Sequence, residues 1–491
     1  MTDPVHDPLT DPLTDPAAPA VPLRETTVRA NAFTEEGPAT GSFAEPFGRW
    51  SIGRPSLGER HLVPSPADPA HWRDPRIGWG VVLPEREGLD AAALATADDA
   101  PEPIRELVRE RAGKVLRYRP GTGLAPWVLR DYAGEGDLFT AASPQGMGPQ
   151  QLPLYLLVAA SPREVPWQVQ YALNPVRHVG RLDLEGEGLA NYVTALLSGW
   201  ADSQAQYAAP LVWSVDHGGG DITSLMREVI GASLATELAG DSDMTAARFI
   251  DGAQDDASGT ALVEALAELR PLLVVTTSHG KTGPLSDPAA MQRDLGMLVD
   301  SSLQAVDPAA LTAGWAPDGA VWFAQACCSA GADQPSAYDG LFAATGQVGR
   351  VLTEVARLGA QTAPTPRALL GASRPLRAFI GQVEPTFNWT MEFPPTRQDL
   401  TSSLRRAVYE GICGGQPVGL ALAPYYTAVG SLLINHGRQL EEFNKGTSGA
   451  LDLATYSKAT AYDRASTVLL GDPTVAIPLP AAAPAGAGGG P

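Results

Sequence analysis

Two stretches of the chain decide its predicted fold: RPLLVVTTSHG at residues 270–280 and AVWFAQACC at residues 320–328. Each is a short apolar run that ends in small or polar residues, which is typical of a strand buried on both faces of a parallel sheet. The first run ends near His279 and the second near Cys327, 48 residues later (327 − 279). That separation allows one crossover helix between neighbouring parallel strands.

Other parts of the chain alternate between strand-like and helix-like patterns. Residues 222–238 carry apolar side chains at helical spacing, with Asp221 as the expected N-cap and Gly240 as the expected stop. The alternation predicts an α/β fold with a mostly parallel sheet and helices on both faces, whose ligands meet the carboxyl ends of the strands. The remaining predicted strands are residues 152–161, 209–215, 247–252 and 377–383, and the remaining predicted helices are residues 258–270 and 341–358.

The ends of the chain have a different composition. Residues 1–45 repeat DPLT and are rich in Pro, Ala and Thr, which predicts a disordered acidic tail. Residues 479–491 are predicted to be a second flexible tail. Aromatic and proline residues interrupt the apolar runs of residues 46–150, so we expect an irregular N-terminal region of unknown role.

Composition excludes several classes of function. The 35 basic and 55 acidic residues give a net charge of −20, which argues against nucleic-acid binding. The apolar runs are shorter than a membrane span and the start of the chain lacks the features of a secretory signal, so we expect a cytoplasmic protein without a membrane partner. Three cysteines do not make a disulfide scaffold, and no paired CxxC motif indicates a zinc site.

A catalytic thiol is the remaining role for Cys327. A thiol needs a base or a positive neighbour to ionise near pH 7, and a histidine at the next strand end would supply one. His217 and His436 also stand in His-Gly pairs after apolar runs. We prefer His279, because His217 lies 110 residues before Cys327 (327 − 217), which we judge too far for a neighbouring strand, and His436 follows the cysteine.

Competing interpretations of the same residues are weaker. A cysteine at the end of a core strand is often only a small hydrophobic residue, and a redox role for the adjacent Cys327 and Cys328 would require a strained ring. HGKT at residues 279–282 resembles the end of a phosphate-binding loop, but position 275 is Val where that loop needs glycine. Cys413 is interpreted as a structural thiol near a helix end.

The two strand ends resemble those of the caspase-like (clan CD) cysteine peptidases. Gln325-Ala326-Cys327 matches the first three positions of the caspase signature, although the glycine follows two places late, at Gly331. The bacterial gingipain-like and CHAT-domain proteases look closer. Further resemblances to that branch are residues 165–182, 378–389 and 469–475, so the likeness covers residues 150–478.

The resemblance implies a caspase-like fold and a cysteine endopeptidase acting on a protein or peptide. Cys327 would be the nucleophile and His279 its acid–base partner, with the N–H groups of Gly280 and Cys327 holding the oxyanion. Residues 151–205 would form a gingipain-like N-terminal subdomain and residues 206–478 the catalytic domain. The mechanism requires no cofactor or metal, although gingipain-like relatives can bind structural calcium.

The resemblance also points to residues that would bind the substrate. Asp216 would form the floor of the pocket and Phe387 and Trp389 its aromatic wall, which favours cleavage after a basic residue. Gln325 matches a caspase residue that helps to bind aspartate and therefore argues the other way. The alternative function is a catalytically silent CHAT-like binding or scaffold module in a bacterial signalling or defence system, whose partner proteins the sequence does not specify.

Overall fold

The computed structural model describes residues 28–33, 38–42, 66–121, 126–393 and 395–480. Its contacts separate Met1–Pro66 from a second compact unit, Ala67–Pro491. In the first unit, β1 (Val28–Phe33) and β2 (Pro38–Gly41) form an antiparallel pair. We expected disorder here, but VRANAF alternates in the manner of a strand, a pattern that the DPLT repeats before it obscured. The remainder of the predicted tail lies outside the described residues.

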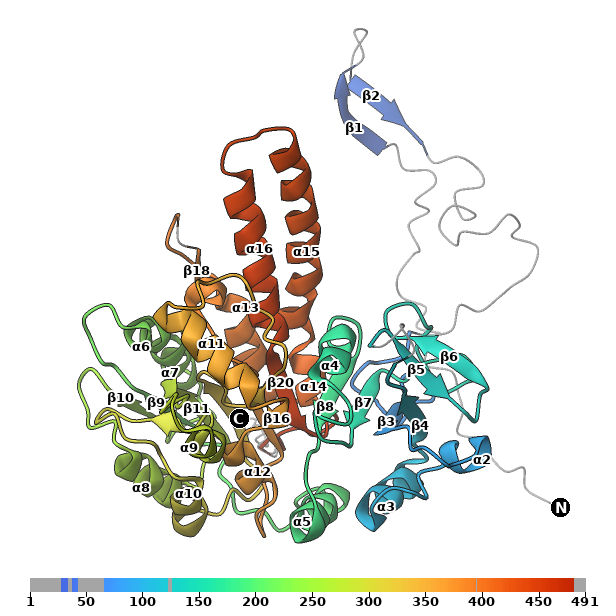
Figure 1. Ribbon diagram of the computed structural model, residues 1–491, viewed down its shortest axis with the longest axis horizontal. Helices are drawn as coiled ribbons and strands as arrows, with labels where there is room; N and C mark the ends of the chain where they lie inside the picture. Colours follow the sequence, from blue (N-terminus) through green and yellow to red (C-terminus); the bar gives the residue numbers. More distant parts are fainter. Residues whose placement is uncertain (1–27, 34–37, 43–65, 122–125, 394, 481–491) are drawn as a thin grey trace, which may run out of the picture. The chain divides into compact units, whose positions relative to one another are not determined.

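The second unit is built on one 12-stranded sheet (Figure 1), in the order β10-β9-β11-β14-β17-β20-β8-β7-β3-β4-β5-β6. Strands β10 to β17 are mutually parallel, β20 is antiparallel to β17, and β20 to β4 are again mutually parallel. The prediction of an α/β fold with a mostly parallel sheet is confirmed. The strands are β3 (Trp79–Pro84), β4 (Lys114–Tyr118), β5 (Val128–Asp131), β6 (Gly136–Phe139), β7 (Tyr155–Val158), β8 (His178–Arg181), β9 (Leu211–Ser214), β10 (Arg248–Asp251), β11 (Leu273–Thr277), β14 (Val321–Gln325), β17 (Ala378–Gln382) and β20 (Thr467–Gly471).

Helices cover both faces of this sheet, as its continuous apolar strands require. Every residue of β11, β14 and β17 is buried. The helices are α2 (Ala91–Leu94), α3 (Glu102–Arg111), α4 (Trp167–Leu173), α5 (Gly186–Ser198), α6 (Ile222–Met226), α7 (Ser233–Ala239), α8 (Gly259–Leu269), α9 (Pro288–Asp294), α10 (Pro308–Gly314), α11 (Gln347–Arg357), α12 (Pro364–Leu370), α13 (Ser402–Arg406), α14 (Val418–Ala421), α15 (Ala423–Asn444) and α16 (Ala450–Ala465).

The region expected to be irregular contributes four strands to the same sheet. Strand β3 pairs in parallel with β7 and with β4, so the sheet continues across residue 150. Strands β5 and β6 then add an antiparallel edge. The expectation failed because β3 is short, follows Gly78 and ends at Pro84, two residue types that are typical of turns. Its successive side chains Val81 and Val82 nevertheless pack into different core clusters.

The helix predicted over residues 222–238 forms, with a π-helical segment η2 (Arg227–Ala232) between α6 and α7. The Asp221 side chain accepts a hydrogen bond from the Thr223 N–H, and Gly240 is the C-cap. Both predicted helix ends are therefore confirmed. A second π-helical segment, η4 (Ala407–Cys413), ends at Cys413, whose side chain is buried.

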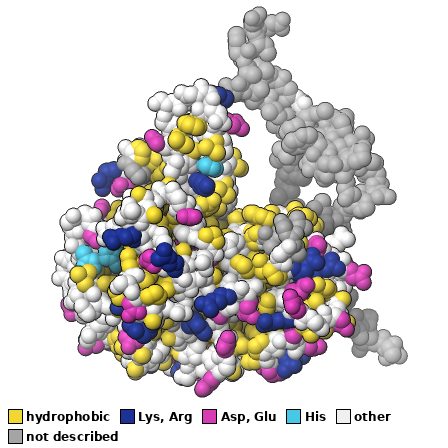
Figure 2. All heavy atoms as spheres, in the orientation of Figure 1, with side chains coloured by type: hydrophobic (Ala, Val, Ile, Leu, Met, Phe, Trp, Pro, Cys, Tyr) yellow, Lys and Arg dark blue, Asp and Glu magenta, His cyan; other side chains and the backbone are white. Residues whose placement is uncertain are grey.

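Helices α15 and α16 project side by side from the rest of the second unit (Figure 1). Apolar side chains remain exposed along them, among them Ile434 and Phe443, and Figure 2 shows such side chains on this projection. Among the described residues, the stretch Val418–Asn444 is long and apolar enough to cross a membrane. Its most apolar 18-residue part has a mean hydropathy of 1.3, and 39% of that part is buried. We expected no such stretch from the lengths of the apolar runs. A single one is weak evidence, because core helices of soluble proteins meet the same test.

Candidate functional site

The ends of β11 and β14 bring the predicted thiol and imidazole to one edge of the sheet. The two strands pair in parallel with Thr277 opposite Gln325. His279 and Cys327 each follow two residues later, so they occupy equivalent positions beyond neighbouring strands. The Ser278 N–H donates to the Gln325 carbonyl at 3.2 Å, which keeps the two segments of backbone together beyond the strand ends. The backbones that follow the two strands are therefore neighbours at His279 and Cys327.

Gly280 lies directly against the backbone of Cys327. A Cβ atom at residue 280 would overlap the Cys327 carbonyl oxygen and would lie 2.9 Å from its nitrogen. Strand β12 (His279–Gly280) pairs antiparallel with β13 (Leu298–Val299), and the next N–H, that of Lys281, donates to the Met297 carbonyl. Because hydrogen bonding alternates along such a strand, the Gly280 N–H points away from β13. Only glycine permits this approach.

Cys327 is the partly exposed member of the cysteine pair. Its sulfur accepts a hydrogen bond from the Thr386 N–H at 3.3 Å and lies 3.6 Å from the Thr386 carbonyl oxygen. Burial, reinforced by the charge of Asp463, raises the pKa of the Cys327 thiol to about 11. The thiol is therefore protonated at neutral pH in this conformation, and its ionisation needs a base.

Cys328 faces a different environment. It is fully buried in an apolar cluster with Met291, Leu295 and Val355, and its φ of 56° places it in a left-handed turn. Adjacent side chains of an extended strand would also point to opposite sides. The two thiols do diverge, but the cause is this turn, since β14 ends at Gln325.

Asp221, which was predicted only as a helix cap, also contacts His279. One carboxylate oxygen accepts from the Thr223 N–H and hydroxyl, and the other lies 2.9 Å from His279 Nε2. Although partial burial acts to raise it, the pKa of Asp221 is lowered, because Thr223 and His279 both hydrogen-bond to the carboxylate. A carboxylate at Nε2 fixes the ring orientation and leaves Nδ1 for chemistry. The only sequence signal was an aspartate soon after a third strand of the same sheet.

His217 lies beside His279, contrary to the argument from sequence separation. The two rings stack with centroids 5.6 Å apart and planes 12° from parallel. The distance of 110 residues misled because β9, which precedes His217, is the other neighbour of β11 in the sheet. Figure 2 shows histidine side chains together on the surface beside α6. His436, by contrast, is on α15 and contacts the Ala454 carbonyl of α16 through Nδ1 at 3.0 Å.

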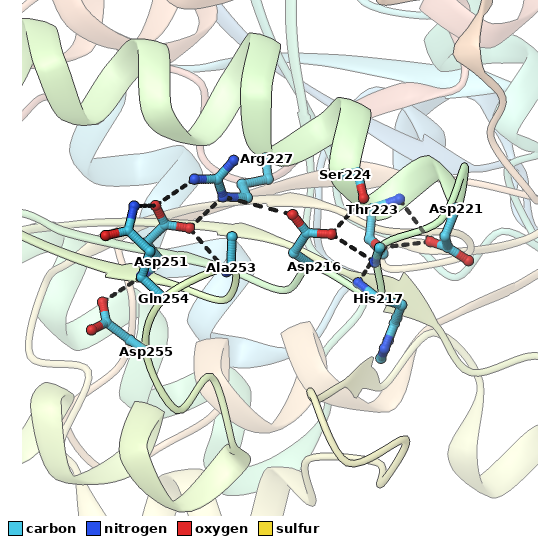
Figure 3. A network of polar contacts seen from close by, with 11 residues as sticks. Asp216, His217, Asp221, Thr223, Ser224, Arg227, Asp251, Ala253, Gln254 and Asp255 are labelled. Carbon is cyan, nitrogen blue, oxygen red and sulfur yellow. Dashed lines mark hydrogen bonds and ion pairs between the residues drawn. The ribbon is translucent and has the colours of Figure 1, made fainter.

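Asp216, the expected floor of the substrate pocket, is already engaged. Figure 3 shows it between Ser224 and Arg227. One carboxylate oxygen accepts from the Ser224 hydroxyl and, at 2.7 Å, from the Gly218 N–H, and the other lies 3.9 Å from Arg227 Nε. Arg227 in turn forms a two-pronged ion pair with Asp251. A basic substrate side chain would therefore have to compete with Arg227 for Asp216.

The other predicted substrate residues lie in two different settings. Gln325 is 3% exposed, and its side-chain oxygen accepts from the Gln382 amide at 3.0 Å, so it belongs to the interior of the sheet. Phe387 and Trp389 are half-buried and stack with centroids 4.3 Å apart. They follow Thr386, the residue that contacts the Cys327 sulfur, and Phe342 stacks on both rings.

No group of three or more His, Cys, Asp or Glu side chains in the described part of the chain is arranged to hold a metal ion. Comparison of the chain with protein-family models, with curated proteins and with solved structures finds no match. The inference of a function therefore depends on the fold and on the geometry of this sheet edge.

Proposed function

We propose that the protein is a caspase-like cysteine endopeptidase that uses Cys327 as nucleophile and His279 as acid and base. The observation that carries the proposal is the pairing of β11 with β14, which places the thiol and the imidazole at equivalent positions on neighbouring strand ends. Asp221 supports it by contacting His279. A carboxylate that orients an imidazole, which serves as the base for a thiol, is a common arrangement around an activated nucleophile.

The reaction follows from these roles. His279 accepts the thiol proton of Cys327 as the sulfur attacks the scissile carbonyl carbon, which forms a tetrahedral intermediate. The N–H groups of Gly280 and Cys327 stabilise its oxyanion. His279 then gives the proton to the departing amine, leaving a thioester. In the second half, a water molecule attacks the thioester carbonyl carbon while His279 takes a proton from that water. The Cys327 sulfur then leaves and receives this proton from His279, and the carboxylic acid product is released.

Cleavage after a basic residue is the substrate preference that we propose. The stacked rings of Phe387 and Trp389 support it, because an aromatic face attracts a cation by about 0.5–2 kcal/mol. The contact of Asp216 with Arg227 weighs against Asp216 as its main partner. We also propose a cytoplasmic location, since Cys327, Cys328 and Cys413 are all unpaired, as is usual in a reducing compartment.

One observation favours a catalytically silent scaffold as the second candidate function. The raised pKa of the Cys327 thiol describes an unreactive resting site. In an active enzyme the substrate must shift this balance, whereas in a scaffold nothing would.

Covalent labelling separates the two candidates. The protein is incubated with an acyloxymethyl ketone that carries arginine, and the labelled residue is identified by mass spectrometry. The peptidase proposal predicts labelling of Cys327 that is lost in Cys327→Ala and strongly slowed in His279→Ala. Absence of labelling, together with no cleavage of a peptide library by the same folded preparation, would support the scaffold.

A further inference from the structure

The backbone that touches the Cys327 sulfur belongs to residues 384–391, which we term the thiol loop. The loop follows β17 and includes the 3-10 turn η3 (Asn388–Thr390). Its Thr386 N–H points at the sulfur. An N–H donor stabilises a thiolate more than a thiol, because a charged acceptor makes the stronger hydrogen bond. The position of this loop therefore bears directly on the reacting atom.

A single carboxylate on another element holds the thiol loop. Asp463, on α16, is 1% exposed. Its two oxygens accept from the hydroxyls of Thr386 at 2.7 Å and Thr390 at 2.9 Å. A second contact from the same helix, the Tyr456 hydroxyl donating to the Trp389 carbonyl at 3.1 Å, reinforces the attachment. The two threonines flank the aromatic pair, so Asp463 secures both the donor at the sulfur and the candidate substrate wall.

We propose that Asp463 is a positioning residue for Cys327: it holds the thiol loop at the sulfur, and its negative charge opposes ionisation of the thiol. The inference rests on the proposed function only in making Cys327 the nucleophile. The contacts themselves do not depend on it. A structural cap alone would fix the loop but would not link the reactivity of the sulfur to the charge of residue 463.

The charge has a definite pH range. Burial raises the pKa of Asp463 to about 6, and the two threonine hydroxyls act against that rise. Asp463 is thus largely ionised at pH 8 and neutral at pH 5. The other titratable groups that interact with it are Arg464, Tyr338 and Tyr425. Both tyrosines stay neutral across this range, because burial raises the pKa of each.

The test is the reaction of Cys327 with 4,4′-dithiodipyridine between pH 5 and pH 8, with the modified cysteine identified by mass spectrometry. Asp463→Asn keeps an acceptor for the loop and removes the charge. At pH 8 the variant should react roughly tenfold faster than the wild type, since a like charge that is connected to the sulfur through one residue, Thr386, disfavours the thiolate. At pH 5 the two rates should agree within twofold. Asp452→Asn, the same change on the exposed first turn of α16, should match the wild type throughout.

A rate ratio for Asp463→Asn that stays constant from pH 5 to pH 8 would overturn the proposal, because a merely structural effect does not follow the ionisation of Asp463. If the variant does not fold, the wild-type profile in a His279→Ala background decides. The logarithm of the rate should rise less steeply near pH 6, and a uniform slope would refute the charge effect. The reagent needs no peptidase activity, so failure of the proposed function and failure of this inference are separately visible.

Discussion

Replacing Asp221 with asparagine separates the two contacts that its carboxylate makes. Asparagine caps a helix about as well as aspartate, so Asp221→Asn should keep the free energy of unfolding within about 0.5 kcal/mol of the wild type. Asp221→Ala removes the cap of α6 and should cost about 1 kcal/mol. The contact with His279 adds little to either value: the two side chains are 31% and 35% exposed, so solvent screening limits it to about 0.5 kcal/mol.

The effect on catalysis should be larger than the effect on stability. Without the carboxylate at Nε2, the His279 ring loses its fixed orientation and tautomer. We expect kcat/KM of Asp221→Asn to fall roughly 10- to 100-fold, less than the two to four orders of magnitude expected for loss of a positioned acid–base group. The assay combines thermal unfolding with cleavage of the best peptide from a library.

A matched control is Asp307, which caps α10 through the Ala309 N–H without a histidine contact in the described residues. Asp307→Asn and Asp307→Ala should reproduce the stability differences and leave kcat/KM unchanged. If Asp221→Asn retains kcat/KM within twofold of the wild type, Asp221 is only a helix cap and the orienting role is wrong.

Three further changes test other parts of the site. Gly280→Ala should lower the melting temperature and abolish labelling of Cys327, because the new Cβ would overlap the Cys327 backbone. Gly430→Ala, with open space around residue 430 on α15, should instead stabilise the protein by up to about 1 kcal/mol. Equal melting temperatures for these two variants would contradict the packing described at Gly280. Asp216→Ala should reduce cleavage after arginine only severalfold if Arg227 occupies the carboxylate; a loss of more than a hundredfold would restore Asp216 as the pocket floor. Burial raises the pKa of Glu384 from 4.5 to about 7, so its native-state pKa lies above the unfolded value and stability falls as pH rises from about 4.5 to 7. Glu384→Gln should remove this pH dependence, which amounts to up to about 3 kcal/mol in the free energy of unfolding, as measured by urea titrations at several pH values. If the variant keeps the pH dependence of the wild type, Glu384 ionises freely in the native state.

Periodicity predicted the strands around the site because each is buried on both faces and reads as an unbroken apolar run. It also predicted the cap at Asp221, whose local hydrogen bond depends only on adjacent residues. The periodicity of apolar residues does not specify the order of the strands in the sheet. Strand β9 borders β11 on the side opposite β14, and that order, set by long-range packing, brings His217 and Asp221 to His279.

The chain region before residue 150 shows a second limit. Strand β3 lies between β4 and β7 in the sheet, and nothing within residues 79–84 specifies those neighbours. The polar environment of the thiol shows a third limit. Asp463 contacts Thr386 across 77 residues of sequence (463 − 386), and buried polar partners of this kind carry no periodic signal. Gln325 matched a family motif, yet its neighbour Gln382 draws the side chain into the sheet.

The central claim is that Cys327 is the nucleophile of a peptidase, and cleavage of a peptide library by matched preparations of wild type and Cys327→Ala tests it most directly. Cys328→Ala serves as the control, since it removes the buried neighbouring thiol without placing an unpaired hydroxyl in an apolar cluster. The account predicts cleavage by the wild type and by Cys328→Ala, concentrated after basic residues, and none by Cys327→Ala. Equal cleavage by wild type and Cys327→Ala would contradict it.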